Sequence, residues 1–410
     1  MILLLVDSME RAYFFERLVH EVRSEFDVLF VTGEPMAHLR LRRAGYRSVY
    51  LRRPLIGIGE TAEILRGARI EASIEVLNEK VTLKNAYRDA TAAVNILGRV
   101  FSNNVISRCL VWNGQQILGR TVTAVAASMG IPVLYLEISN LPSKLFVDPE
   151  GVNALSSIRR DNRAINQCCV PLQEEHAAWM VEYERYKSAP LPQARVHWKW
   201  QLASLCNIAV KHATRGVIQG TLSLATVSRR AASILDAREH SEAELAAMPY
   251  VFLPLQVSAD TQIKLHSDVD NFQAIERAAK IAEELELGLL VKLHPAERDA
   301  NSIRRLFQLR EQLSFEFTGS PTVTLIRHAH RVVTINSTVG LEALLYDKPL
   351  TTLGRAFYEG FDRDTLLKYI HGFLFDGIDY FGKVPVPAVA ARRVLAWTEG
   401  RESAGFHKGS

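Results

Sequence analysis

The segment Arg331–Glu342, RVVTINSTVGLE, decides the fold because it places a buried strand directly before a capped helix. Val332–Ile335 is apolar and mostly β-branched, which is typical of a parallel strand covered on both faces. Asn336–Thr338 consists of residue types that cap helices, and Leu341–Leu345 is a strong helix former. The segment therefore predicts a strand–turn–helix junction of an α/β protein.

Such a junction leaves backbone N–H groups at the positive end of a helix dipole, which suits a phosphate. An ordinary capped helix is the alternative, because the same residue types also cap helices that bind nothing. A second apolar strand, Gly288–Pro295, favours a binding site because it ends in Lys292, His294 and Pro295. Ligands of open α/β sheets bind beyond the carboxyl ends of strands, and a separation of about forty residues fits one βαβ repeat. We expect both segments to line one cleft.

The chain has 410 residues, too many for one ordinary core, and this length predicts two domains. Its hydrophobic content of 48% and charged content of 23% are those of a folded soluble protein. The net charge of +4 is small and does not favour nucleic acid. No CxxC pair occurs among Cys109, Cys168, Cys169 and Cys206. We therefore expect neither a disulfide framework nor a metal site, and we expect the protein in a reducing compartment.

The N-terminus begins with the short apolar run Met1–Val6. It lacks a basic leader and a cleavage site, so it predicts a first strand rather than a signal peptide. No run approaches the roughly eighteen apolar residues of a membrane helix, and any membrane role would be peripheral. Asp7–Glu10 stands where a GxGxxG motif would open the first helix, which argues against a dinucleotide enzyme.

Strand and helix patterns alternate in residues 1–154 and again in residues 246–382, which predicts an α/β fold with two Rossmann-like domains. Residues 155–245 are rich in Ala, Arg and Glu with helical periodicity, and predict a helical subdomain or linker between the domains. Residues 383–410 predict a C-terminal helix that packs back on the body. The expected strands are Met1–Val6, Phe26–Val31, Cys109–Trp112, Val133–Leu136, Tyr250–Gln256, Gly288–His294, Val332–Ile335 and Lys348–Leu353.

One part of the helical region, Arg185–Trp200, mixes basic and aromatic residues. This composition could contact a membrane surface or an anionic acceptor. We prefer a solvated helix face with tryptophan in an interdomain seam, because the segment shows no clear amphipathic pattern.

Four ordered motifs in the second half resemble the signature of the capsule polysaccharide synthesis family, which contains β-Kdo transferases that use CMP-Kdo. They are Val251–Gln262, Lys292–Pro295, Asn336–Leu344 and Lys348–Gly360. A weaker resemblance in the first half rests on Trp112–Gly114, Leu136–Glu137 and Phe146–Asn153. The family more often has a glycine soon after the glutamate, where this chain has Ile138–Asn140.

The resemblance implies a GT-B fold, with two Rossmann-like domains facing a central cleft and the donor nucleotide held by the C-terminal half. His294 and Pro295 would contact CMP. Ser337 and Thr338, with the helix N-terminus behind them, would hold its phosphate, because oriented N–H donors stabilise charge that develops on a leaving group. The other residues expected on the donor side are Asn336, Lys292, Gln256 and Gly340, with Glu342 as a weaker candidate that would only support the helix dipole.

Two carboxylates of the first half are candidates for the sugar chemistry. Glu137 ends a predicted strand and Asp148 follows a short apolar run eleven residues later, so both can reach one cleft from neighbouring strands. Retaining transfer by double displacement needs a carboxylate nucleophile and a second group for proton transfer. Because the β-Kdo transferases are retaining, we assign Asp148 as nucleophile and Glu137 as general acid/base, with the exchange of roles open. Asp148 could instead start the turn Asp148–Gly151, and Asp236 is a rival nucleophile.

The resulting hypothesis is a retaining glycosyltransferase that moves Kdo from CMP-β-Kdo to a bacterial surface-glycan precursor, either a capsule linker or an O-antigen chain. Its partners would be CMP-Kdo and a glycolipid or oligosaccharide acceptor, with no cofactor, no metal and no nucleic acid. We expect a cytoplasmic protein at the inner face of the inner membrane. A nucleotide-sugar epimerase of GT-B-like fold, and a non-catalytic adaptor in a glycan assembly complex, are the alternatives.

Overall fold

The structure is a computed structural model that describes residues 1–54, 62–188, 198–219, 237–297 and 299–397. The chain divides into two compact units. Unit 1 holds the described residues of 1–169, 191–223 and 371–410, and unit 2 holds those of 170–190 and 224–370. These limits differ from the predicted boundaries at 154, 245 and 382, because described residues of 371–410 join unit 1 and those of 170–190 join unit 2.

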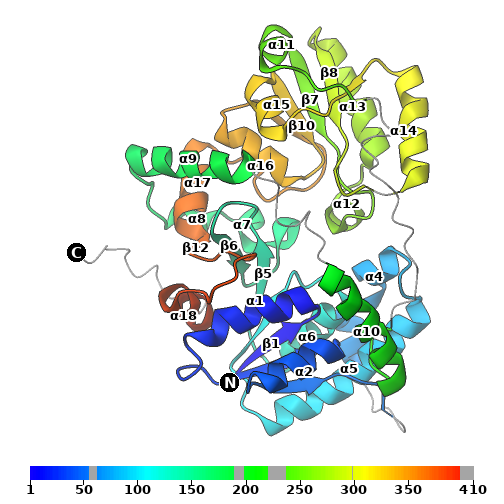
Figure 1. The fold of residues 1–410 in the computed structure, drawn as a ribbon, viewed down its shortest axis with the longest axis vertical. Coiled ribbons are helices and arrows are strands. Elements are labelled where there is room, and N and C mark those ends of the chain that lie inside the picture. The colour runs from blue at the N-terminus through cyan, green and yellow to red at the C-terminus, as the bar shows by residue number, and fades with distance from the viewer. Residues whose placement is uncertain (55–61, 189–197, 220–236, 298, 398–410) are drawn as a thin grey trace. The chain divides into compact units, whose positions relative to one another are not determined.

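In the described residues, unit 1 contains a seven-stranded sheet with the order β12-β6-β5-β4-β1-β2-β3 (Figure 1). Strands β1 to β5 run parallel, while β6 is antiparallel to β5 and β12 is antiparallel to β6. The strands are β1 (Ile2–Val6), β2 (Val28–Thr32), β3 (Arg47–Tyr50), β4 (Arg108–Trp112), β5 (Val133–Ile138), β6 (Lys144–Asp148) and β12 (Phe375–Asp376).

The core of unit 1 forms because the strands are apolar on both faces. All five residues of β1 are buried. Ile2, Leu4 and Val6 pack in a cluster with residues of α1 (Met9–His20), α2 (Pro35–Arg43) and α18 (Ala388–Ala396). The predicted C-terminal helix is α18, and its Val394 and Leu395 are fully buried in this cluster. Helices α3 (Ala62–Ala68), α5 (Leu83–Asn103) and α6 (Ile117–Ser128) pack together in a separate cluster.

Unit 2 contains, in its described residues, a five-stranded parallel sheet with the order β11-β10-β7-β8-β9. The strands are β7 (Tyr250–Pro254), β8 (Gly288–Lys292), β9 (Glu316–Phe317), β10 (Arg331–Thr334) and β11 (Leu350–Thr352). Alternate residues of β7 serve the two faces of the sheet: Val251 and Leu253 pack with α13 (Asn271–Glu284) and α14 (Ala300–Gln312), whereas Tyr250 and Phe252 pack with α11 (Glu242–Ala247) and α15 (Thr322–His328).

The described residues between β6 and β7 form helices, in keeping with the predicted helical region. Arg185 lies near the end of α9 (Gln173–Ser188) and α10 (Trp198–Thr214) begins at Trp198, while residues 189–197 of the basic and aromatic segment lie outside the described residues. The remaining helices are η1 (Ile70–Ala72), α4 (Ile74–Leu77), η2 (Asn153–Leu155), α7 (Ser157–Arg160), α8 (Arg163–Asn166), α12 (Thr261–His266), α16 (Thr338–Leu345), α17 (Arg363–Lys368) and η5 (Tyr369–Phe373).

The predicted strands correspond to observed ones, with changed ends. The strand expected to reach His294 stops at Lys292, and the one expected to reach Ile335 stops at Thr334. Strands β3, β6, β9 and β12 are not among the expected strands. Strands β3, β9 and β12 have two to four residues, too few to show a period, and the sequence indicates β6 only as a short apolar run before Asp148. Among the described residues, no helix combines the length and apolar character that crossing a membrane requires.

Candidate functional site

Three neighbouring strands of unit 2 end in loops that carry the predicted donor residues. Strand β7 lies between β10 and β8 in the sheet, and all three run parallel. Gln256 follows β7, His294 follows β8, and Asn336–Thr338 follows β10. Because parallel strands end at the same edge, these loops meet at the carboxyl edge of the sheet (Figure 1).

The junction between β10 and α16 has the geometry that its sequence predicts. Ser337 is the N-cap, and its Oγ accepts a hydrogen bond of 3.2 Å from the Val339 N–H. The Ser337 N–H donates in turn to Thr334 Oγ1 at 3.3 Å. Thr338 is the first residue of the eight-residue helix, so the positive end of the α16 dipole faces the carboxyl edge.

Gln256 and Asn336 are buried and bind each other rather than solvent. Gln256 Nε2 donates to Asn336 Oδ1 at 3.1 Å, and the Asn336 N–H donates to Gln256 Oε1 at 3.2 Å. Asn336 Nδ2 donates to the carbonyl of Gln262 at 2.9 Å. Their amides therefore join the β7 loop to the β10 loop, which gives both residues a positioning role in place of the predicted nucleotide contact.

Gly340 makes room for a tyrosine that fixes the cap. The Tyr358 hydroxyl donates to the carbonyl of Ser337 and is fully buried. A Cβ atom at Gly340 would lie 2.5 Å from that hydroxyl oxygen. Gly340 thus allows Tyr358 to pack closely against α16. Any contribution of Gly340 to the predicted donor site would be indirect, through the position of Ser337.

Replacing Gly340 by alanine is expected to lower the free energy of unfolding by about 1–3 kcal/mol, because Tyr358 must move. The matched control is Gly98→Ala in α5, where an added Cβ meets no atom within 4 Å. That change is expected to raise stability by roughly 0.5–1 kcal/mol, since alanine favours a helix interior over glycine. Urea unfolding of both variants measures the two changes in free energy of unfolding. Equal changes of the same sign would contradict the role of Gly340 in packing against Tyr358.

His294 and Pro295 lie on the exposed loop after β8. The Ala296 N–H donates to His294 Nδ1 at 3.0 Å. A neutral imidazole that accepts at Nδ1 carries its proton on Nε2, so the local backbone fixes His294 as an Nε2–H donor. This orientation suits a hydrogen bond to an oxygen of a nucleotide.

Lys292 is held by backbone carbonyls at the end of β8. Its Nζ donates to the carbonyl of Gly319 at 3.3 Å and to that of Ser320. Burial lowers the pKa of Lys292, and the nearby Glu239 opposes that shift. Lys292 therefore ties β8 to the loop after β9, and its predicted place in the cleft is supported only by its position in the chain.

Glu297 is a site residue that the sequence analysis missed. It is 3% exposed, and its Oε2 accepts from the N–H and the hydroxyl of Ser258, both at 2.8 Å. Its Oε1 accepts from the Asp299 N–H at 2.8 Å. Glu297 thereby joins the β7 loop to the β8 loop, and its spacing of three residues from His294 is the signal that could have identified it.

Glu342 anchors a helix rather than supporting a dipole. Its carboxylate accepts from the Tyr183 hydroxyl at 2.9 Å and from Lys187 Nζ at 2.7 Å. Both partners lie on α9, and Glu342 is 5% exposed. This buried pair explains why residues 170–190 belong to unit 2.

In unit 1, Glu137 lies near the carboxyl end of β5 beside the β4 loop. Asn113 Nδ2 donates to its Oε2 at 2.5 Å, and the Ile138 N–H donates to its Oε1 at 3.0 Å. Asn113 and Gly114 adopt positive φ angles of 58° and 83°. A Cβ at Gly114 would lie 2.6 Å from the Tyr135 ring, so only glycine allows this turn to present Asn113 to Glu137.

Asp148 is fully buried and its oxygens are engaged. They accept from the N–H groups of Glu150 at 2.8 Å and Gly151 at 3.1 Å, and from the Ser157 hydroxyl at 2.6 Å and N–H at 3.0 Å. Burial raises the pKa of Asp148, and the bonds from Ser157 oppose that shift. This geometry favours the turn-forming alternative over a nucleophile.

The register of β5 and β6 puts Tyr135 opposite Asp148 and Glu137 opposite Phe146. Glu137 and Asp148 therefore share one face of neighbouring strands as diagonal neighbours, as the sequence predicts. Glu137 accepts from the Asn113 side chain and the Ile138 N–H, whereas the oxygens of Asp148 accept from several backbone N–H groups. Asp236, the rival nucleophile, lies outside the described residues.

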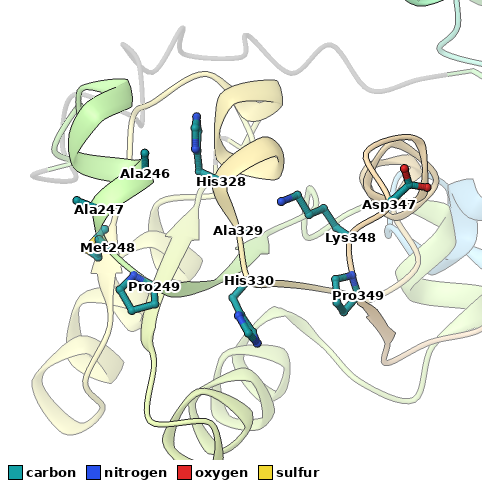
Figure 2. A pocket seen from close by; sticks show the side chains of 10 residues that line it. All are labelled: Ala246, Ala247, Met248, Pro249, His328, Ala329, His330, Asp347, Lys348 and Pro349. Carbon is teal, nitrogen blue, oxygen red and sulfur yellow. The ribbon is translucent and has the colours of Figure 1, made fainter.

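A cavity of about 490 Å³ opens at the opposite, amino edge of the unit 2 sheet (Figure 2). Pro249, His330 and Pro349 on its wall directly precede β7, β10 and β11. His328 also lines it and lies 3.2 Å from Glu242 through Nε2 and Oε1. The cavity is thus separate from the loops that carry the predicted donor residues.

Comparison with known families gives a match over most of the second half of the chain and part of the first. The profile of the family described as "Capsule polysaccharide biosynthesis protein" matches residues 108–365. Escherichia coli KpsS, a "capsule polysaccharide export protein", is 30% identical over 275 residues, which cover 57% of this chain and 63% of KpsS. Protein FixF of Sinorhizobium fredii is 29% identical over 238 residues, which cover 57% of this chain and 45% of FixF. The chain thus spans less than two thirds of the length of these relatives.

Solved structures also match this chain, with low TM-scores and low sequence identity. Thermosulfurimonas dismutans KpsC, described as a "beta Kdo 2,7 transferase", matches with a TM-score of 0.40 and 14% identity over 74% of this chain and 88% of that chain. A putative UDP-N-acetylglucosamine 2-epimerase from Listeria monocytogenes matches with a TM-score of 0.30 and 11% identity over 96% and 94% of the two chains. The predicted α/β fold, with two parallel-rich sheets, is confirmed.

Proposed function

Because the chain belongs to the capsule polysaccharide biosynthesis family, we propose that it is a retaining glycosyltransferase that moves Kdo from CMP-β-Kdo to a surface-glycan precursor. The acceptor would be a capsule linker or an O-antigen chain, and the reaction would take place in the cytoplasm at the inner face of the inner membrane. The observation that carries the proposal is the meeting of the β7, β8 and β10 loops at one edge of the unit 2 sheet.

The donor side would use the α16 N-terminus and His294. Ser337 caps α16, and the backbone N–H groups of its first turn and Thr338 would hold the phosphate of CMP. His294 accepts at Nδ1 from the Ala296 N–H, and its Nε2–H would donate to a nucleotide oxygen, with Pro295 shaping the loop. The leaving phosphate gains negative charge as the sugar departs, and fixed donors stabilise that charge more in the transition state than in the ground state.

The catalytic side would use Glu137, which takes the nucleophile role that the sequence assigns to Asp148. We propose Glu137 as the nucleophile that forms a covalent Kdo intermediate, since Asn113 and the Ile138 N–H orient its carboxylate. The positive charge of Arg11 also interacts with the carboxylate of Glu137. Asp148 would fix the end of β6, the strand that pairs with the Glu137 strand β5.

The test is incubation of the protein with CMP-Kdo, generated in situ, and a panel of glycolipid and oligosaccharide acceptors. We expect CMP release and a Kdo-bearing product whose new linkage is β. Absence of both with every acceptor would contradict the proposal. Preferential thermal stabilisation by UDP over CMP would favour an epimerase, and mass-spectrometric detection of Kdo bound to Glu137 would exclude a non-catalytic adaptor.

A further inference from the structure

Unit 1 has a topological switch point, where its strand order reverses. The chain runs from β1 through β2 to β3 on one side of β1, and β4 and β5 then add on the other side. Ligands of open parallel sheets bind at such a switch point, beyond the carboxyl ends of the two strands. Here those ends are Val6 and Trp112, which are followed by Asp7 and Asn113.

Glu75 reaches this edge from outside the sheet. It lies on the short helix α4, and its two carboxylate oxygens are 3.1 and 3.3 Å from the N–H of Ile117, the first residue of α6. The Ile74 N–H donates to the carbonyl of Gln115 at 3.1 Å, which fixes α4 against the loop after β4. Glu75 is therefore placed beside the loop that also carries Asn113.

Buried polar atoms around this edge have no hydrogen-bond partner among the residues that the structure describes. They are Asn113 Oδ1, Gln116 Oε1, Arg11 Nε and Arg120 Nε. Asn113 uses its other amide atom to orient Glu137, and Arg11 uses a second nitrogen to bind Asp7 at 2.7 Å. Buried groups of this kind normally find a partner, and two acceptors and two donors are the kinds of atom that bind the hydroxyl groups of a sugar.

The charged groups that face Glu75 come from three directions. They are Asp7 after β1, Lys80 after α4, and Arg120 on α6. Burial raises the pKa of Glu75 to about 7, Asp7 adds to the rise, and Lys80 and the Ile117 N–H oppose it. A carboxyl group that titrates near neutral pH suits proton transfer in either direction.

We infer that Glu75 is the general base that takes the proton of the acceptor hydroxyl, at an acceptor-sugar site formed where β1 and β4 end. The inference rests on the proposed transfer reaction and supplies the proton acceptor that the enclosed Asp148 cannot. The acceptor oxygen forms a bond to the anomeric carbon of the Kdo carried by Glu137. The bond from that carbon to Glu137 breaks and leaves its electron pair on the carboxylate, while the hydroxyl proton passes to Glu75 and then to solvent.

The test is Glu75→Gln, which keeps the size of the side chain and one oxygen for the Ile117 N–H. We expect the kcat of transfer to acceptor to fall at least 100-fold, while the single-turnover release of CMP from CMP-Kdo stays within about threefold of wild type. The rise of kcat with pH near neutrality should disappear, and Glu75→Asp should restore part of the rate. The matched control is Glu71→Gln on the neighbouring η1, where Glu71 is exposed and binds the Tyr87 hydroxyl, and it should leave the rates unchanged.

A second measurement tests whether Glu75 transfers protons or only caps the N-terminus of α6. The pKa of Glu75 is raised in the folded state, so its contribution to stability is present below its unfolded pKa and is lost as pH rises through about 7. Glu75→Gln lacks this loss, so its urea midpoint should rise relative to wild type between pH 5 and pH 8. A midpoint difference independent of pH, or a wild-type pH–rate profile in Glu75→Gln, would overturn the inference alone. A wild-type protein that releases no CMP from CMP-Kdo would overturn the proposed function, and this inference with it.

Discussion

Glu137→Gln is expected to reduce Kdo transfer at least about 1000-fold while CMP binds as in wild type, because the amide cannot act as a carboxylate nucleophile. The side chain keeps its length, so one oxygen can still accept a hydrogen bond from Asn113 or the Ile138 N–H. Steady-state CMP release measures the loss. Mass spectrometry should find a Kdo adduct on wild-type protein and none on the variant.

The matched control for this change is Glu21→Gln. Glu21 is a half-exposed glutamate of the same unit, close to His20 at the end of α1 and outside the carboxyl edge. It should retain wild-type transfer. Normal transfer by Glu137→Gln would remove Glu137 from the chemistry, and a loss of CMP binding in that variant would show that the change disturbs the donor side as well.

Asp148→Asn is expected to lower the free energy of unfolding by roughly 3 kcal/mol. The amide would turn an NH₂ group toward donors that now bind carboxylate oxygens, in a place with no solvent to compensate. Transfer should fall in proportion to the fraction of folded protein, and the Kdo adduct should still form. Urea unfolding and adduct detection on the same sample measure both effects.

Glu150→Gln, in the same turn, tests whether the effect belongs to the buried carboxylate. The Glu150 side chain is 35% exposed and pairs with the more exposed Arg160 on α7, so its neutralisation should change stability by less than about 0.5 kcal/mol. A fully stable Asp148→Asn protein that forms no adduct would instead make Asp148 the nucleophile, as the sequence predicts.

The sequence predicts the junction after β10 well because its information is local. Apolar β-branched residues, a serine cap and a leucine-rich helix follow one another within twelve residues, and each acts on its neighbours. The strands of both sheets are also predicted from local patterns. The strand order of unit 2 places the loops that carry His294 and Ser337 at one edge of the sheet.

What the sequence does not predict depends on partners far along the chain. Gln256 looks like a ligand-binding residue, but its amide is taken up by Asn336, eighty residues later. Glu342 binds Lys187, 155 residues earlier, and this pair assigns α9 to unit 2. No period or motif encodes such pairs, because they depend on where the folded units bring separate helices together.

The roles of the carboxylates in the candidate site also depend on contacts that the sequence does not encode. The sequence does not distinguish the roles of Asp148 and Glu137. In the structure, hydrogen bonds from Gly151 and Ser157 enclose the carboxylate of Asp148, whereas Asn113 orients that of Glu137. Glu75 carries no motif at all, and its place beside Ile117 arises from the packing of α4 on the β4 loop.

Calorimetric titration of CMP into wild-type protein, His294→Ala and His330→Ala tests most directly where the nucleotide binds. His294 lies on the carboxyl-edge loop after β8, whereas His330 is exposed on the cavity at the amino edge of the same sheet. We expect one CMP site in wild type and in His330→Ala, with Kd values equal to each other and lower than those for UDP. In His294→Ala the Kd should rise about 10- to 100-fold, the effect of one hydrogen bond to a charged group. Equal CMP affinity in wild type and His294→Ala, or weakening only in His330→Ala, would contradict binding at the β7–β8–β10 edge.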